Sequence, residues 1–170
     1  EPYYARLRDR FASISGAEAA RRGDFVAVMP GGTLVVGDAT VTHAQAASYV
    51  RAAAVTTGSA AAAAEKRKRD GLAAIVTSAG YEFWPLATES HGLHGKSSRA
   101  FVNKLGTIAA SRGDISKSAF VRSVYKALSI ALVRGQSIMY DASLERVVRA
   151  AGQSFEQGSR VVLQECCADV

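Results

Sequence analysis

Two apolar runs separated by a Pro-Gly-Gly turn constrain the fold of this chain most strongly. The run DFVAVM over residues 24–29 and the run TLVVGDATVT over residues 33–42 flank PGG at residues 30–32. Runs rich in β-branched residues favour strands, and proline followed by glycine favours a tight turn. The sequence therefore predicts an antiparallel β-hairpin.

Helices and one further strand are expected on either side of this hairpin. Apolar residues at helical spacing predict a helix over residues 3–14. The alanine-rich segment 44–77 has high helix propensity, with a possible break at residues 57–59. The segment YEFWPLAT, residues 81–88, predicts a third strand, and its Pro85 favours an edge position or a bulge.

The rest of the chain reads as helical. A helix is predicted over residues 99–111, another after Ser116 as its N-cap, and a last one from Ser137 or Ser143 to Ala151. The expected fold class is therefore α/β with an α+β character: a small mixed sheet, made of the hairpin and one further strand, flanked by helices. We expect residues 1–97 to form the core with the site, and residues 98–170 to form a helical extension packed on the same domain.

Composition bounds the class of protein. The chain has 170 residues, of which 48% are hydrophobic and 21% are charged, as in an ordinary soluble globular domain. No apolar run is long enough to span a membrane. The net charge of +6 raises the expectation of a nucleic-acid partner, although an anionic membrane surface also attracts basic proteins. Because the chain begins with Glu1 and not methionine, we expect a piece of a longer protein.

The adjacent cysteines Cys166 and Cys167 make a poor disulfide pair, which favours a reducing intracellular compartment.

An aspartate interrupts the second strand. Period-two alternation places Asp38 on one face with Leu34 and Val36, and the hairpin brings Asp24 near it. Two neighbouring carboxylates repel each other unless a divalent cation lies between them, and oxygen-only ligation of this kind suits Mg²⁺. The alternative is that Asp24 caps a strand and Asp38 lies exposed at a bulge.

The charged run EKRKRD, residues 65–70, lies towards the far end of the long helix. Lys68, or its neighbour Lys66, could reach the two acids and stabilise a phosphorane-like transition state. Arg67 and Arg69 would then hold a phosphate backbone nearby. A solvated helical face is the simpler interpretation of such a run.

The third strand leads into a loop that carries further candidates. Glu89 follows the strand at its carboxyl end, where open α/β sheets often place functional side chains, but it could equally be a helix or turn cap. His91, His94 and Lys96 lie in a glycine-rich loop and are candidates for contacts to phosphate or DNA. A zinc site built from these histidines and the two cysteines matches no common ligand spacing.

Several stretches, in this order, resemble the region downstream of the reverse transcriptase in site-specific non-LTR retrotransposons. In that family the region is a restriction-like endonuclease of the PD-(D/E)xK superfamily. The resemblance covers residues 21 to about 150. The stretches are RRGDFVAV, LVVGDATVTHAQAASYVRAAA, AAAAAEKRKR, GYEFWPLATESHGLHGKSSRAFVNKLG and FVRSVYKALSIALVRGQSIMY.

The family's motifs can be matched residue by residue. They fall on Arg21 with Asp24, Asp38 with Thr40 and Val41, Glu65 with Lys68, and Phe83 to Glu89 followed by Gly92. The chain departs from these motifs in three places. Thr40, two positions after the second acid, stands where the superfamily at large more often has its lysine. Gly23 stands where the superfamily motif has proline, and Gly71 with Leu72 follow the helical lysine where the family commonly has Lys-Tyr.

The resemblance implies a nuclease. Asp24 and Asp38 would bind Mg²⁺ or Mn²⁺, Lys68 would position the nucleophile or the transition state, and Glu65, Lys66, Glu89 and Thr40 would support them. The partners implied are target DNA, element RNA and the remainder of a larger polyprotein, in the nucleus and without a membrane. Nicking of the target would create the primer end for reverse transcription. The alternatives are a nucleic-acid-binding module that has lost the chemistry and a structural module of a ribonucleoprotein.

Overall fold

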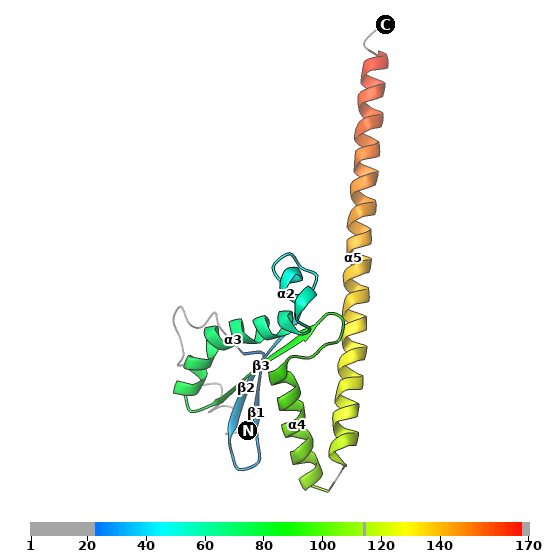
Figure 1. Cartoon of the computed structure of the whole chain (residues 1–170). Helices are drawn as coiled ribbons and strands as arrows, with labels where there is room; N and C mark the ends of the chain where they lie inside the picture. Colours follow the sequence, from blue (N-terminus) through cyan, green and yellow to red (C-terminus); the bar gives the residue numbers. More distant parts are fainter. Residues whose placement is uncertain (1–22, 114, 168–170) are drawn as a thin grey trace, which may run out of the picture. The chain divides into compact units, whose positions relative to one another are not determined.

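The computed structural model describes residues 23–113 and 115–167, with side chains as far as residue 151. Its elements follow the chain in the order strand, strand, helix, helix, strand, helix, helix (Figure 1). They are β1 (Phe25–Val28), β2 (Leu34–Thr42), α2 (Val50–Val55), α3 (Ser59–Ser78), β3 (Glu82–Glu89), α4 (Lys96–Ser111) and α5 (Lys117–Cys167). The predicted helix over residues 3–14 lies outside the described residues.

The predicted hairpin is confirmed. Strands β1 and β2 pair antiparallel, with Phe25 opposite Gly37 and Val28 opposite Leu34. The turn between them is closed by a backbone hydrogen bond of 3.0 Å from Gly32 N–H to the Met29 carbonyl. Gly32 has a φ of 82°, a conformation that glycine adopts without strain.

The third strand is also confirmed and lies at an edge. The strand order is β1-β2-β3, and β3 runs parallel to β2. A parallel neighbour needs a long crossover connection, which α2 and α3 provide. Pro85 is fully buried in β3, and the edge position explains why a residue without an N–H group is tolerated there.

Helices cover both faces of the sheet. On one face Val36 packs against Leu72 and Val76 of α3. On the other face Val35 packs against Phe101 of α4. Because successive residues of a strand point to opposite faces, the even-numbered residues of β2 face α3 and the odd-numbered residues face α4. The fold class is therefore the mixed α/β arrangement expected, with a small mixed sheet and a helical C-terminal half.

Three predicted boundaries were wrong. Residues 44–49 form turns, with Tyr49 N–H bonded to the Ala46 carbonyl at 2.8 Å, and the helix begins only at Val50. Helix α4 begins at Lys96, three residues earlier than expected, because a distant carboxylate caps it, as described below. The two helices predicted after Ser116 are one helix, Lys117–Cys167, and Ser116 Oγ accepts a hydrogen bond from Ala119 N–H, which confirms it as the N-cap.

The chain divides into two compact units between Tyr125 and Lys126. The first contains the sheet, α2, α3, α4 and the first turns of α5, and the second contains the rest of α5. Among the described helices, none combines the length and the apolar character that a membrane span requires.

Candidate active site

Asp38 and Lys68 form an ion pair between the central strand and α3. Asp38 is an even-numbered residue of β2 and therefore faces α3, where Lys68 Nζ lies 2.5 Å from its Oδ1. The two side chains are only 14% and 19% exposed. A carboxylate this far removed from water needs a compensating charge, and Lys68 supplies it. Of the two lysines proposed for this role, Lys68 is the one that reaches the strand.

Asp24 lies beside this pair. It precedes β1 by one residue, and continuing the register of Phe25 with Gly37 places it opposite Asp38. Its Oδ2 accepts a 2.6 Å hydrogen bond from the backbone N–H of Ala39, the residue after Asp38. Side chains at opposite positions of an antiparallel pair share a face, with Cβ atoms about 5 Å apart. The two acids and Lys68 therefore gather on the α3 side of the sheet, as does the half-buried Thr40.

These residues fit a hard divalent cation. Each aspartate has one oxygen engaged, and within the described residues no hydrogen bond reaches Asp38 Oδ2 or Asp24 Oδ1. Mg²⁺ is commonly bound by one or two carboxylates, with substrate phosphate and water completing its shell. No group of three or more His, Cys, Asp or Glu side chains suited to a metal occurs in the described part of the chain. The donor set on offer is thus two carboxylates.

Glu65 is occupied elsewhere. It is 4% exposed and accepts hydrogen bonds of 3.1 Å from both Ser97 N–H and Ser98 N–H, in the first turn of α4. The first N–H groups of a helix have no partner within the helix, so a carboxylate here satisfies them. A Cβ atom at Gly95 would overlap the Glu65 carboxylate, which explains the glycine before α4.

Glu89 has the same kind of role at the preceding helix. It is 6% exposed, and its Oε1 accepts a 3.1 Å hydrogen bond from Ala61 N–H in the first turn of α3. The N-cap positions of α3 and α4 are Gly58 and Gly95, which carry no side chain to cap with. The structure therefore brings neither glutamate into a hydrogen bond with Asp38, Asp24 or Lys68.

The other cations of α3 point away from Asp38. Lys66 pairs with Asp70, one turn further along the exposed side of the helix. Arg67 donates a 2.5 Å hydrogen bond to the hydroxyl of Tyr49, and this bond lowers the pKa of Tyr49 below its ordinary value. Arg69 is exposed. Sequence reasoning missed Tyr49, because the turn that carries it was read as helix.

The histidines gather at the carboxyl ends of β2 and β3. His91 lies against His43, with ring centroids 5.4 Å apart, and His43 Nδ1 shares a 2.5 Å hydrogen bond with Ser90 Oγ. His94 stacks on Tyr125 at 4.7 Å. Burial lowers the pKa of His94, and the nearby charge of Arg99 lowers it further. Sequence reasoning missed His43, whose proximity to His91 follows from the parallel pairing of their strands.

Lys96 and Arg21 were predicted to contact nucleic acid. Lys96 is exposed at the start of α4. Arg21 and the side chains of Cys166 and Cys167 lie outside the described residues.

Comparison with known proteins gave no match. No family model, curated protein or solved structure matches this chain.

Proposed function

We propose that this chain is a metal-dependent endonuclease that hydrolyses a phosphodiester bond of DNA. One observation carries the proposal: Asp38, Asp24 and Lys68 come from three separate elements of the sequence and meet on one face of the sheet. Two carboxylates beside one lysine are the groups that cation-assisted phosphodiester hydrolysis uses. The resemblance to retrotransposon endonucleases, on these same residues, supports the proposal independently.

Each residue has a role that its position allows. Asp24 and Asp38 would hold Mg²⁺ through the carboxylate oxygens that face away from Ala39 N–H and Lys68. The cation, when bound, neutralises phosphate charge and lowers the pKa of the attacking water. Lys68 would leave or share its bond with Asp38 and place its ammonium against the charge that develops on the phosphoryl oxygens. Its partial burial keeps that charge poorly screened by solvent.

The biological setting follows from the resemblance. The enzyme would nick one strand of a target DNA and leave an end that primes reverse transcription within a larger retrotransposon protein. The basic net charge of the chain agrees with a DNA or RNA partner.

A second candidate function is nucleic-acid binding without cleavage. Glu65 and Glu89 are occupied as helix caps, so only Asp24 and Asp38 remain to bind a cation. This small set of ligands favours binding without cleavage. It is favoured also by the Lys68–Asp38 ion pair, since Lys68 already supplies the positive charge that a cation would bring.

Nicking of supercoiled plasmid by the purified chain separates the two functions. We expect the natural chain to nick the plasmid with Mg²⁺ or Mn²⁺ and to lose this activity in EDTA. The rate of nicking should fall at least about 100-fold in Asp38→Asn and in Lys68→Met, as for other residues that stabilise charge in a transition state. Asp70→Asn and Lys66→Met are the matched controls, because they remove the same charges from the exposed side of α3.

The controls also define failure. If the natural chain binds plasmid but does not nick it with either metal, the endonuclease proposal is wrong and the binding module is favoured. If Asp70→Asn loses as much activity as Asp38→Asn, the activity does not arise at the site proposed.

A further inference from the structure

The segment that follows the third strand is unusually basic. Between residues 90 and 125 the sequence has six Lys or Arg residues and one acid, Asp114, whose placement lies outside the described residues. Lys104 is paired with Glu82. The other five, in the described part of the chain, have no carboxylate within ion-pair distance. They are Lys96, Arg99, Arg112, Lys117 and Arg122.

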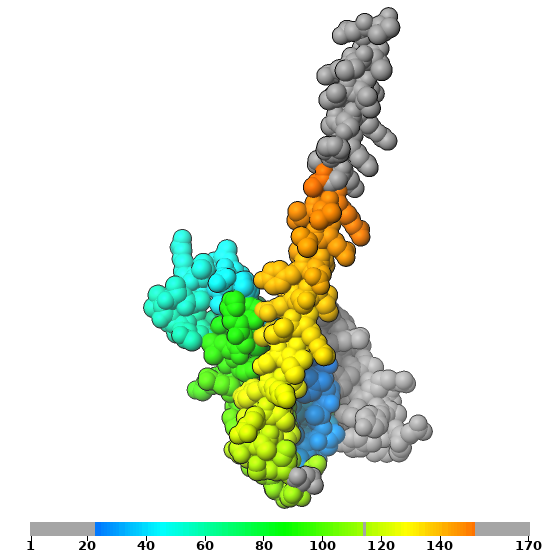
Figure 2. Space-filling view, turned by 90° about the vertical axis from the view of Figure 1, so that its right-hand side faces the viewer, coloured from blue at the N-terminus to red at the C-terminus, as the bar shows by residue number. Residues whose placement is uncertain are grey.

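This charge is concentrated over two packed helices. The first turns of α5 lie against α4 (Figure 2), and Gly106 permits the close approach, since a Cβ there would come within 3.0 Å of Val121 Cγ2. Between the two helices is an open hollow of about 610 Å³. Its lining residues are Asn103, Lys117, Ser118, Val121 and Arg122.

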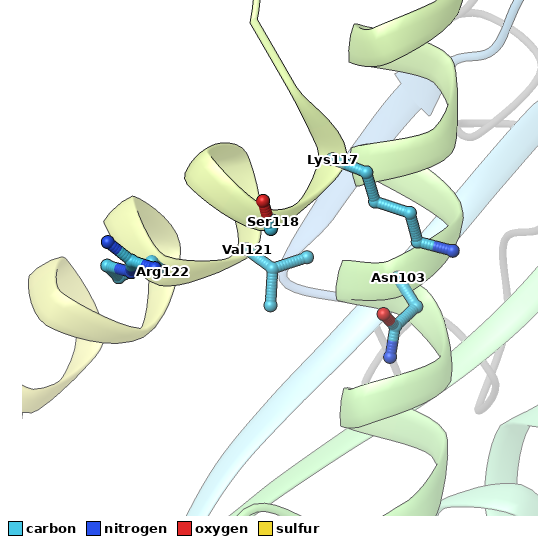
Figure 3. Close-up of a pocket in the computed structure, with 5 residues that line it drawn as sticks. All are labelled: Asn103, Lys117, Ser118, Val121 and Arg122. Carbon is cyan, nitrogen blue, oxygen red and sulfur yellow. The ribbon is translucent and has the colours of Figure 1, made fainter.

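Basic and polar side chains border the hollow, whose exposed lining is mostly apolar. In Figure 3 the side chain of Lys117 reaches over α4 towards Asn103, and Arg122 extends from the other side of Val121. Asn103 uses one N–H on the Arg99 carbonyl and keeps a second donor. Among the described residues, no carboxylate lines the hollow. Lys, Arg, Ser and Asn side chains are those that contact nucleic-acid phosphates.

The hollow lies on the opposite side of the sheet from the acid pair. Helix α4 packs on the Val35 face, whereas Asp38 and Lys68 lie on the Val36 face, under α3. A phosphate in the hollow therefore cannot belong to the nucleotide at Asp38, and the hollow must hold a different stretch of the polymer.

We propose that Lys117, Arg122, Asn103 and Ser118 form a second nucleic-acid site, which binds the phosphodiester backbone through the hollow between α4 and α5. The inference rests on the proposed function for the class of partner only, and requires no cleavage. The partner is duplex DNA flanking the target, because the proposed function acts on DNA; binding of single-stranded RNA instead is an outcome of the test.

Equilibrium binding in EDTA, where the proposed nuclease is inactive, tests this site on the full chain. A duplex DNA and a single-stranded RNA of equal length serve as probes, each over a series of salt concentrations. Lys117→Ala/Arg122→Ala is compared with Arg51→Ala/Arg146→Ala, which removes the same charge from exposed positions of α2 and the second unit. We expect only Lys117→Ala/Arg122→Ala to weaken binding. Because it removes two phosphate contacts, the magnitude of the slope of log K against log salt should fall by about 1.8 with duplex DNA or by about 1.4 with RNA.

A reduced slope with duplex DNA supports the proposal, and a reduced slope with the RNA alone would overturn duplex DNA as the partner. Equal affinity and slope in the two double variants, with both probes, would overturn the proposal, as would the absence of binding by the natural chain. Misfolding of the alanine variant is excluded if its circular dichroism spectrum and its urea midpoint match those of the natural chain. If the alanine variant is unstable, Lys117→Gln/Arg122→Gln replaces it. Plasmid nicking, measured separately, decides the proposed function whatever the result here.

Discussion

At the scale of single residues, Asp38 shows how a strand accommodates a charge. Alternation along β2 was enough to predict that Asp38 shares a face with Leu34 and Val36, and Val36 is buried on that face against α3. The charged run by itself left Lys66 and Lys68 both open, and only the resemblance favoured Lys68. Which lysine reaches the strand depends on how α3 is rotated over the sheet, and that rotation is set by the packing of Leu72 and Val76 on Val36.

Gly23 has a structural explanation. A Cβ atom at this position would overlap Val36 Cγ1, so a residue with a side chain requires movement of Val36 or of the strand. The proline expected from the resemblance would meet the same overlap.

His94 gives a prediction about pH. Its pKa is lowered in the folded chain, so the unfolded chain binds more protons in the mildly acidic range. The stabilisation is complete above about pH 6.5, the ordinary value for histidine, and is lost as the pH falls towards the folded-state value. We expect His94→Gln to reduce the loss in free energy of unfolding between pH 7.5 and pH 5.5, measured by urea denaturation.

His91→Gln is the control for this measurement. His91 lies in the same loop and is exposed, so its replacement is the matched substitution outside the stack of His94 on Tyr125. An identical response of the two variants would show that the stack of His94 on Tyr125 does not determine the effect.

At the scale of elements, two buried glutamates connect the helices. Glu89 at the end of β3 caps α3, and Glu65 within α3 caps α4. Each helix therefore begins where a carboxylate from another element meets its free N–H groups. This explains the early start of α4, which nothing in the segment 90–98 indicates apart from Gly95.

Replacing Glu65 tests this arrangement. We expect Glu65→Ala to lower the free energy of unfolding by about 2–4 kcal/mol, because it leaves the backbone N–H groups of Ser97 and Ser98 without their acceptor. Glu65→Gln keeps one acceptor oxygen and should lose about half as much. Urea denaturation measures both.

Glu82→Ala provides the comparison. It removes a carboxylate from a partly exposed ion pair with Lys104 and should cost about 1 kcal/mol or less. A loss in Glu65→Ala no larger than this would refute the capping role.

The long helix shows a different limit of sequence reasoning. Ser143 was predicted as a possible helix start, but its hydroxyl donates a 2.7 Å hydrogen bond to the Met139 carbonyl, four residues back within α5. Serine can bond in either way, at a helix start or along its interior. Local sequence did not distinguish the two.

At the scale of the molecule, the first unit contains the buried core. The three clusters of buried apolar residues all lie between residues 29 and 102. Beyond Tyr125 the described side chains are mostly exposed, including Val133 at 64% and Tyr140 at 75%. The folded core should therefore depend little on residues 126–170.

Truncation after Tyr125 tests this division. We expect the shortened chain to unfold cooperatively, with a free energy of unfolding within about 1 kcal/mol of the natural chain, because few buried contacts are lost. Thermal melting followed by circular dichroism measures it. Loss of the folded state in the shortened chain would show that the second unit contributes to the core.

The sequence by itself determined the hairpin, the third strand and the residues that share a face with Asp38, and it narrowed the place of Pro85 to an edge or a bulge. These follow from β-branched alternation, glycine turns and the missing N–H of Pro85, which act over a few residues. Only the tertiary structure decided that Lys68 reaches Asp38, that Glu65 and Glu89 serve as caps, and that His43 meets His91. Each of these contacts joins residues about thirty or more positions apart, so each depends on how helices and strands pack against one another.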